Sequence, residues 1–203
     1  MWIKICGLTT AEAVSAALEA RVDAIGFVFS DSVRRVTPAQ AARLAEGTPA
    51  RVLRVAVTRH PAQALIDEVL AEFRPDALQT DRADFARLRL PAGLARLPVV
   101  RGGLPGDALV PPRLLFEGAD SGSGLLSDWQ AAASLARRSE LILAGGLSAA
   151  NVADAVAAVV PFGVDVSSGV ESRPGLKNPA EIARFVLAAR ASGAAPVHQK
   201  ESP

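Results

Sequence analysis

The segment Trp2-Ile3-Lys4-Ile5-Cys6-Gly7, at the start of the 203-residue chain, is the part from which its architecture can be inferred. It is a short apolar run with β-branched residues at alternate positions and a glycine at its end, which predicts a buried strand. Cys6, at the carboxyl end of that strand, is the only cysteine of the chain. A single thiol is more often a small core residue than a reactive group, so the other strand ends must decide its role.

Seven similar apolar runs follow the first one, and Ala- and Leu-rich helical patterns separate most of them. Strands that are apolar along nearly their whole length, each followed by a helix or a loop, are typical of a parallel sheet covered on both faces. Eight such units predict an α/β fold, a closed (β/α)8 TIM barrel in a single domain, with a doubly wound open sheet as the alternative. The seven runs lie at residues 24–29, 52–57, 77–79, 98–101, 114–117, 141–144 and 163–166.

Helix signals lie between the predicted strands. Thr9 or Thr10 is suited to capping the first helix, and Pro38 is typical of a first helical position. We expect the barrel domain to cover residues 1–191 and the segment 192–203, rich in Gly, Ala, Pro and charge, to be a disordered tail. The expected helices run from the threonine cap to residue 20 and over residues 38–45, 61–73, 83–88, 128–138, 149–159 and 179–191, whereas residues 102–112 contain too many glycines and prolines for a full helix.

The composition excludes several classes of protein. The net charge is +1 and no basic stripe is interleaved with aromatic residues, so we expect no nucleic-acid partner. A single cysteine cannot form an internal disulfide, and with only two histidines, His60 and His198, it does not make a zinc-type cluster. We therefore expect no metal and no cofactor. The sequence has no recognisable cleavable leader and no apolar run of membrane-spanning length, which predicts a cytoplasmic protein without a membrane partner.

Polar residues and glycines follow most of the predicted strands. In a (β/α)8 barrel these loops form the active site, and the loops after the seventh and eighth strands are the usual phosphate site. A Gly-Gly pair alone is an ordinary turn, but two loops that offer backbone N–H groups and hydroxyls on adjacent strands predict a bound phosphate group. The predicted phosphate-binding residues are Gly145, Gly146, Ser167, Ser168 and Gly169, and the other strand ends contribute Cys6, Arg34, Arg35, Gln79, Asp81, Glu117 and Asp165.

Two of these residues are candidates for proton transfer. Glu117 ends an apolar run, and partial burial raises the pKa of a carboxyl group so that it can hold a proton near neutral pH. The alternative for Glu117 is a rim carboxylate paired with Arg101, at the end of the preceding strand. For Cys6, an ordinary thiol pKa of about 8.5 leaves only a few per cent thiolate at pH 7. Lys4, on the same strand face, either lowers the pKa of that thiol or pairs with another charge inside the barrel.

Six motifs, in chain order, resemble the phosphoribosylanthranilate isomerase family. The resemblance extends from residue 3 to about residue 178, and its opening KICG and its late DVSSGVE run are the most specific parts. The motifs are KICGLT from Lys4, AIGFVF from Ala24, RRVTP from Arg34, SGSG from Ser121 with Asp128-Trp129, LAGGL from Leu143 with Asn151-Val152, and DVSSGVE from Asp165 with PGLK from Pro174.

The resemblance implies an isomerase of tryptophan biosynthesis, which catalyses the Amadori rearrangement of N-(5-phosphoribosyl)anthranilate to 1-(2-carboxyphenylamino)-1-deoxy-D-ribulose 5-phosphate. In that family the residue that matches Cys6 is the general base, and the general acid is an aspartate at the position that Glu117 occupies here. Arg34 matches the arginine that pairs with the anthranilate carboxylate, and Gln79 and Asp165 match further substrate contacts. The implied partner is a small phosphosugar, bound by a monomer or a homodimer.

The chain departs from the family pattern at three positions. Glu117 replaces the aspartate that acts as the general acid, Asp81 stands where a histidine is common, and Asn178 stands where an aspartate is usual. Asp120 is a fallback for the acid. Three other functions match parts of the pattern. They are a related barrel isomerase of the histidine pathway, which usually has two aspartates and no such cysteine, a phosphopentose epimerase, which needs metal ligands, and a barrel that binds a phosphate ligand without turnover.

Overall fold

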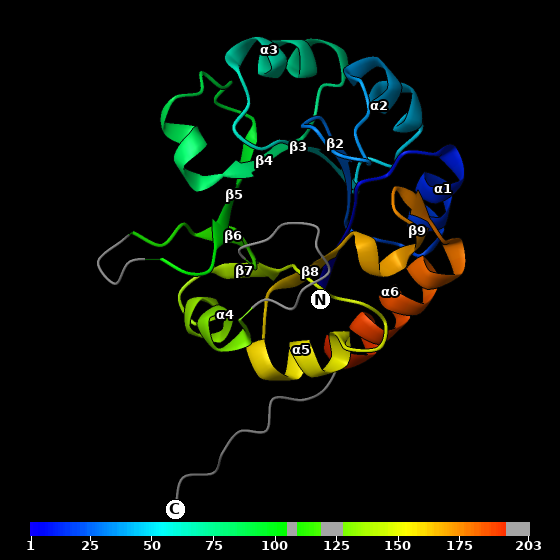
Figure 1. The fold of residues 1–203 in the computed structure, drawn as a ribbon, viewed down its shortest axis with the longest axis vertical. Helices are drawn as coiled ribbons and strands as arrows, with labels where there is room; N and C mark the ends of the chain where they lie inside the picture. The colour runs from blue at the N-terminus through cyan, green and yellow to red at the C-terminus, as the bar shows by residue number, and fades with distance from the viewer. Residues whose placement is uncertain (105–108, 119–127, 194–203) are drawn as a thin grey trace, which may run out of the picture.

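The structure is a computed structural model that describes residues 1–104, 109–118 and 128–193. Eight parallel strands form a closed barrel in the order of the sequence, and the helices lie around it (Figure 1). β8 closes the barrel on β1, with Lys4 opposite Asp165. The predicted (β/α)8 barrel is thereby confirmed, and the open sheet is excluded. The strands are β1 Trp2–Cys6, β2 Ala24–Val28, β3 Leu53–Val57, β4 Ala77–Asp81, β5 Ala95–Arg101, β6 Arg113–Glu117, β7 Glu140–Leu143 and β8 Gly163–Val166.

Most helices begin at the residues that suggest a cap in the sequence. The Thr10 side chain accepts a hydrogen bond from the N–H of Ala13, and Asp128 caps its helix in the same manner. Thr37 and Gln40 form a capping box around Pro38. The helices are α1 Ala11–Glu19, α2 Pro38–Leu44, α3 Gln63–Glu72, α4 Trp129–Ala136, α5 Val152–Val159 and α6 Pro179–Gly193; short 3-10 helices cover Arg82–Ala86 (η1) and Ser168–Val170 (η2), and β9 Glu171–Arg173 pairs with β10 Leu176–Lys177.

Several element boundaries differ from those expected. β4 continues through the polar residues to Asp81, because each of its last residues pairs with β5. The expected helix over 83–88 is the 3-10 helix η1. α6 ends at Gly193, beyond the expected end of the domain at residue 191. The rest of the expected tail lies outside the described residues.

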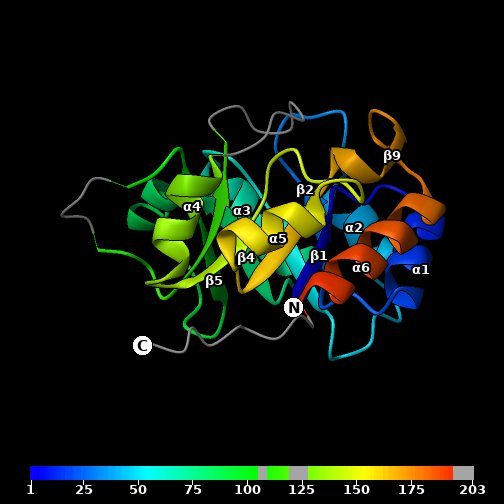
Figure 2. The same cartoon turned by 90° about the horizontal axis from the view of Figure 1, so that it is seen from below.

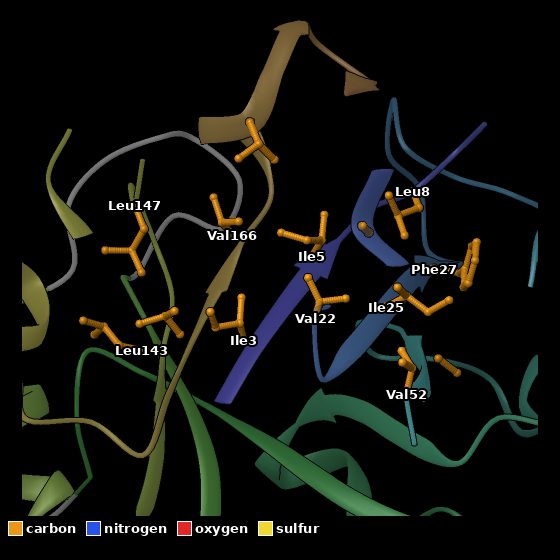
Figure 3. Close-up of a cluster of buried hydrophobic side chains, with 14 of the residues drawn as sticks. Ile3, Ile5, Leu8, Val22, Ile25, Phe27, Val52, Leu143, Leu147 and Val166 are labelled. Carbon is orange, nitrogen blue, oxygen red and sulfur yellow. The ribbon is translucent and has the colours of Figure 1, made fainter. Parts of the chain in front are cut away.

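Alternate residues of the strands face the helices and the barrel interior. Ile3 and Ile5 of β1 and Ile25 and Phe27 of β2 are fully buried between the sheet and the helices (Figure 3). Lys4 points the other way and is also fully buried, with its ammonium group on Asp165 of β8. The barrel interior therefore holds charge at a level where other strands place aliphatic side chains.

The carboxyl ends of the strands define one mouth of the barrel. In Figure 2, β1 runs from the N-terminus at the lower end of the barrel toward the end where β9 lies. The carboxyl ends of β2, β4, β6, β7 and β8 thus meet at the same end, as the fold requires. Among the described residues, no helix is long and apolar enough to cross a membrane.

Candidate active site

A cavity of about 240 Å³ opens at the carboxyl ends of the strands. It brings together nearly all the strand-end residues to which the sequence pattern assigns a role in substrate binding or proton transfer. Arg35, Asp81 and Gly169 do not line it. The fallback acid Asp120 lies outside the described part of the chain. The predicted residues that line the cavity are Cys6, Arg34, Gln79, Glu117, Gly145, Gly146, Asp165, Ser167 and Ser168.

Cys6 ends β1 with only 6% of its surface exposed. Burial raises the pKa of its thiol, and Asp165 adds to this effect, while Lys4 and Lys177 oppose it without cancelling it. Lys4 donates from Nζ to Asp165 Oδ1 at 2.8 Å. Burial lowers the pKa of Lys4, but Asp165 and Cys6 raise it more strongly, so it is raised overall. Lys4 thus pairs with a second charge, as in the alternative reading of the sequence, and still favours the Cys6 thiolate.

A glycine of the neighbouring strand makes room for this pair. Gly26 lies opposite Cys6 in the register of β1 and β2. A Cβ atom at position 26 would lie 3.2 Å from Cys6 Sγ and 3.2 Å from Lys4 Nζ. The absence of a side chain at Gly26 therefore leaves space for the Cys6 thiol and the Lys4 ammonium group.

Glu117 ends β6 and is bound to Arg101 of β5. Arg101 Nη1 lies 3.0 Å from Glu117 Oε2, and its Nη2 lies 2.9 Å from Oδ1 of Asp81 on β4. All three side chains are less than one-fifth exposed. The ion pair considered as an alternative for Glu117 is therefore present, and the same guanidinium group holds the aspartate that departs from the family pattern.

Asp81 has further partners on the opposite side. His60 Nε2 lies 3.2 Å from Asp81 Oδ2, and Arg59 Nε lies 3.9 Å from the same oxygen. His60, Asp81 and Asp84 place possible metal ligands within 4.8 Å of one another. Both carboxylates already have arginine partners, since Arg87 Nη2 lies 2.6 Å from Asp84 Oδ1. We therefore interpret His60, Asp81 and Asp84 as part of a network of ion pairs and not as a metal site.

Arg34, the predicted carboxylate-binding residue, is held by a residue that sequence reasoning missed. Arg34 Nε and Nη2 donate to Oε1 and Oε2 of Glu171 at 2.7 and 2.9 Å. Burial alone would raise the pKa of Glu171, but the hydrogen bonds from Arg34 and Lys177 outweigh it and lower the pKa. A substrate carboxylate at Arg34 would therefore meet a guanidinium group already oriented by a carboxylate.

The two glycine-containing loops after β7 and β8 pack closely on one another. Gly145 and Gly146 have φ angles of 90° and 67°, which favour glycine. Asn151 Nδ2 donates to the carbonyl oxygen of Gly146 at 2.9 Å and fixes the loop. A Cβ atom on Gly169 would lie 1.9 Å from the carbonyl oxygen of Leu147. The missing side chain of Gly169 allows the contact between the two loops, and its role in phosphate binding stays a prediction.

Gln79 is the predicted site residue with an unused polar atom. It is 4% exposed and lines the cavity from β4. Its Oε1 has no hydrogen-bond partner within the described ranges. A buried acceptor without a partner loses free energy unless a ligand or a water supplies a donor. Gln79 is thus suited to accept a hydrogen bond from a bound molecule.

Known proteins resemble the chain over nearly its full length. The family model for N-(5'-phosphoribosyl)anthranilate (PRA) isomerase matches residues 3–188. The N-(5'-phosphoribosyl)anthranilate isomerase of Mesorhizobium japonicum is 37% identical over 212 residues, which cover 94% of this chain and 95% of that protein.

Two solved structures have the same fold. The crystal structure of TrpF from Jonesia denitrificans has a TM-score of 0.76 at 35% identity and covers 96% of this chain and 98% of that one. A phosphoribosyl anthranilate isomerase in complex with reduced 1-(o-carboxyphenylamino)-1-deoxyribulose 5-phosphate has a TM-score of 0.74 at 30% identity, with 94% and 99% covered. With the match of the family model, these similarities show that the chain belongs to the N-(5'-phosphoribosyl)anthranilate isomerase family.

Proposed function

We propose that the chain catalyses the Amadori rearrangement of N-(5-phosphoribosyl)anthranilate, with Glu117 as general acid and Cys6 as general base. The observation that carries the proposal is one cavity lined by a thiol, a carboxyl group and two loops suited to phosphate. In the closed strand order, β7 and β8 lie between β6, which carries Glu117, and β1, which carries Cys6. A sugar anchored by its phosphate at these two loops would therefore have the acid on one side and the base on the other.

The anthranilate part of the substrate would then point across the barrel. The strands opposite β7 and β8 are β3 and β4. Gln79 of β4 lines the cavity, and its Oε1 has no partner in the described part of the chain. Arg34 lies on the loop after β2, next to this half of the mouth, and also lines the cavity. We assign Gln79 to a donor of the substrate and Arg34 to its carboxylate, for which a guanidinium group is well suited.

The first chemical step needs a proton on Glu117. Protonation of the furanose ring oxygen opens the ring to a protonated imine. Arg101 contacts the carboxylates of both Asp81 and Glu117. We assign the proton of this step to Glu117, because its carboxyl group lines the cavity and that of Asp81 does not.

The second step needs the thiolate of Cys6. It takes the proton from C2 of the open-chain imine, and the resulting enolamine tautomerises to the ketone product. Lys4 and Lys177 favour the thiolate, whereas burial and Asp165 favour the thiol. The base is therefore a thiol held close to two cations rather than a permanently ionised group.

The test is the loss of anthranilate-type fluorescence from freshly prepared N-(5-phosphoribosyl)anthranilate. We expect rapid loss with the wild-type chain and a rate lower by about 10²- to 10⁴-fold in Cys6→Ala and in Glu117→Gln. Glu140→Gln, an exposed residue at the start of β7, is the matched control and keeps the rate. A fully active Cys6→Ala variant rules out the base, and loss of activity in Asp120→Asn but not in Glu117→Gln transfers the acid to Asp120.

A barrel that binds phosphate without turnover is the second candidate, favoured by the departures at Glu117 and Asp81. Two results together would identify such a barrel: the wild-type chain binds inorganic phosphate, and the fluorescence is lost only at its spontaneous rate. The cytoplasmic location, the domain limits and the choice between monomer and homodimer remain predictions. Cell fractionation and sedimentation would test the location and the oligomeric state.

A further inference from the structure

Lys177 of β10 is a buried lysine to which the proposed reaction assigns no direct contact with the substrate. Its side chain is 0% exposed. Its Nζ donates to Glu171 Oε1 at 2.6 Å, to the Ser167 carbonyl oxygen at 3.0 Å and to Ser167 Oγ at 3.1 Å. An ammonium group has three protons and no acceptor, so these three bonds use its whole capacity.

The bond to Ser167 Oγ fixes what the serine hydroxyl can do. A hydroxyl group has one proton to donate, and this oxygen is already an acceptor for Lys177. No acceptor among the described residues takes the serine proton. Ser167 lines the cavity next to Gly145 and Gly146. Its hydroxyl proton is therefore available to an acceptor inside the cavity.

We propose that Lys177 is a positioning residue that fixes the Ser167 hydroxyl as a hydrogen-bond donor to the phosphate group of the substrate. The inference rests on the proposed function, because it requires a phosphosugar in the cavity. It extends that function by giving the hydroxyl one direction, since an ammonium neighbour cannot accept the serine proton.

Glu171 keeps the ammonium group in place. Its Oε1 binds both Lys177 and Arg34, and its Oε2 binds Arg34 again and the N–H of Gly175. The lysine is thus held by Glu171 as well as by Ser167. Arg34, Glu171 and Lys177 carry a net charge of +1 together, which suits an anion at the adjacent loop.

The same network couples the two ends of the proposed substrate. Ser167 faces the phosphate group, and Arg34 faces the anthranilate carboxylate, and one carboxylate side chain holds both through Lys177. A Cβ atom on Gly7 would lie 2.6 Å from Arg34 Cδ and 3.1 Å from Ser167 Oγ. The residue after the catalytic thiol therefore has to be small for the network to form beside it.

The experiment compares Ser167→Ala, Lys177→Met and the double variant, with inorganic phosphate as competitive inhibitor. We expect phosphate inhibition to weaken by about tenfold or more in each single variant, because each removes one charge-assisted hydrogen bond or its orientation. KM for the substrate rises in parallel, while kcat changes far less. In the double variant the loss equals that of Ser167→Ala alone, because Lys177 acts through the hydroxyl group.

Two results would overturn the proposal. Unchanged phosphate inhibition in Ser167→Ala would show that the hydroxyl group is not a donor to phosphate. This test remains possible if Lys177→Met does not fold, because Ser167→Ala keeps the Lys177–Glu171 pair. Losses that multiply in the double variant mean that Lys177 acts as a charge and not through Ser167. Ser172→Ala is the matched control, because Ser172 lies exposed on β9, where its hydroxyl donates to the Leu176 carbonyl oxygen.

Failure of the proposed function has a different signature. It would leave the wild-type chain without turnover, and phosphate binding can then be measured by calorimetry in the same four proteins. Equal phosphate affinity in wild type and Ser167→Ala overturns the positioning role whether or not the wild type turns over substrate. Weaker affinity in both Ser167→Ala and Lys177→Met, with no turnover in any protein, overturns the reaction and keeps the role, whereas weaker affinity in Ser167→Ala but not in Lys177→Met overturns the role of Lys177.

Discussion

The ionisation of Cys6 can be measured directly, because the chain has no other cysteine. Burial and the charge of Asp165 raise the pKa of the thiol, and Lys4 and Lys177 oppose them. The perturbation is Asp165→Asn, which removes a negative charge but keeps an oxygen that can accept the hydrogen bond from Lys4. We expect the wild-type thiol to titrate above the ordinary value of about 8.5 and the variant to titrate lower.

The size of the effect follows from the ionised fraction. A thiol with a pKa of about 8.5 is roughly 10% ionised at pH 7.5, and that fraction rises about tenfold by pH 9.5. A raised pKa makes the rise larger, toward a limit of about a hundredfold. Removing the negative charge of Asp165 lowers the pKa of the thiol, so Asp165→Asn should react faster than the wild type at pH 7.5.

The assay is alkylation of the native protein by iodoacetamide at a series of pH values, followed by mass measurement. Cys6 is only 6% exposed, so restricted access slows the reaction at every pH, and the ratio of the rates at pH 9.5 and pH 7.5 cancels this factor. We expect a ratio above about ten for the wild type and a smaller one for Asp165→Asn. A wild-type ratio below ten, or a slower variant at pH 7.5, refutes the electrostatic account of the base.

Two further outcomes are expected. Gly169→Ala should weaken phosphate inhibition and lower the thermal unfolding temperature, because its Cβ would lie 1.9 Å from the Leu147 carbonyl oxygen; a variant equal to wild type in both would show that the two loops need not touch. Stability should fall as the pH drops below about 4, because the pKa values of Asp76, Asp84 and Glu171 are lowered in the fold. For each of them burial raises the pKa, but hydrogen bonds and nearby positive charges lower it by more. Their stabilisation is complete above the unfolded-state pKa and is lost toward the lower folded-state values, and denaturant unfolding that is equally stable at pH 5 and pH 3 would contradict this.

The strands were predictable because each one is buried on both faces. Ile3 and Ile5 face the helices, and the apolar run that contains them gives a strand in any parallel sheet. The ends of β4 and β5 were not predictable from apolar runs alone. Asp81 and Ala95 belong to strands because their neighbours offer backbone partners, and backbone pairing does not depend on the polarity of the side chain.

The helix ends show the same limit. The helix expected from Ala149 begins at Val152, because Ser148 N–H binds Asn151 Oδ1 and the intervening residues form a turn. Helix propensity favours Ala149, but the side chain of Asn151 is used to shape the loop that contains Gly146. Local hydrogen bonds of this kind compete with the helix and leave little trace in the hydrophobic pattern.

The location of the site was predictable, but the partners of its residues were not. The rule that strand ends share one mouth places Cys6 and Glu117 in the same cavity. The bond between Arg34 and Glu171 joins residues 137 positions apart, and it depends on the β9–β10 hairpin after the barrel closes. Glu171 and Lys177 belong to motifs that carry the family resemblance, which is the signal that the sequence offers for them, but their contacts depend on the three-dimensional fold.

The two departures from the family pattern near the acid are connected in space. Asp81 pairs with Val99, and Arg101 pairs with Glu117, so the barrel register brings the ends of β4, β5 and β6 to successive levels at one edge of the mouth. Arg101 bridges the two carboxylates at 2.9 and 3.0 Å. A glutamate side chain is one methylene longer than that of an aspartate, and its carboxyl group is therefore free to adopt more positions unless a partner holds it. Arg101 holds it here, and Asp81 in turn holds Arg101, so the two positions at which the chain departs from the expected pattern belong to one network of charges.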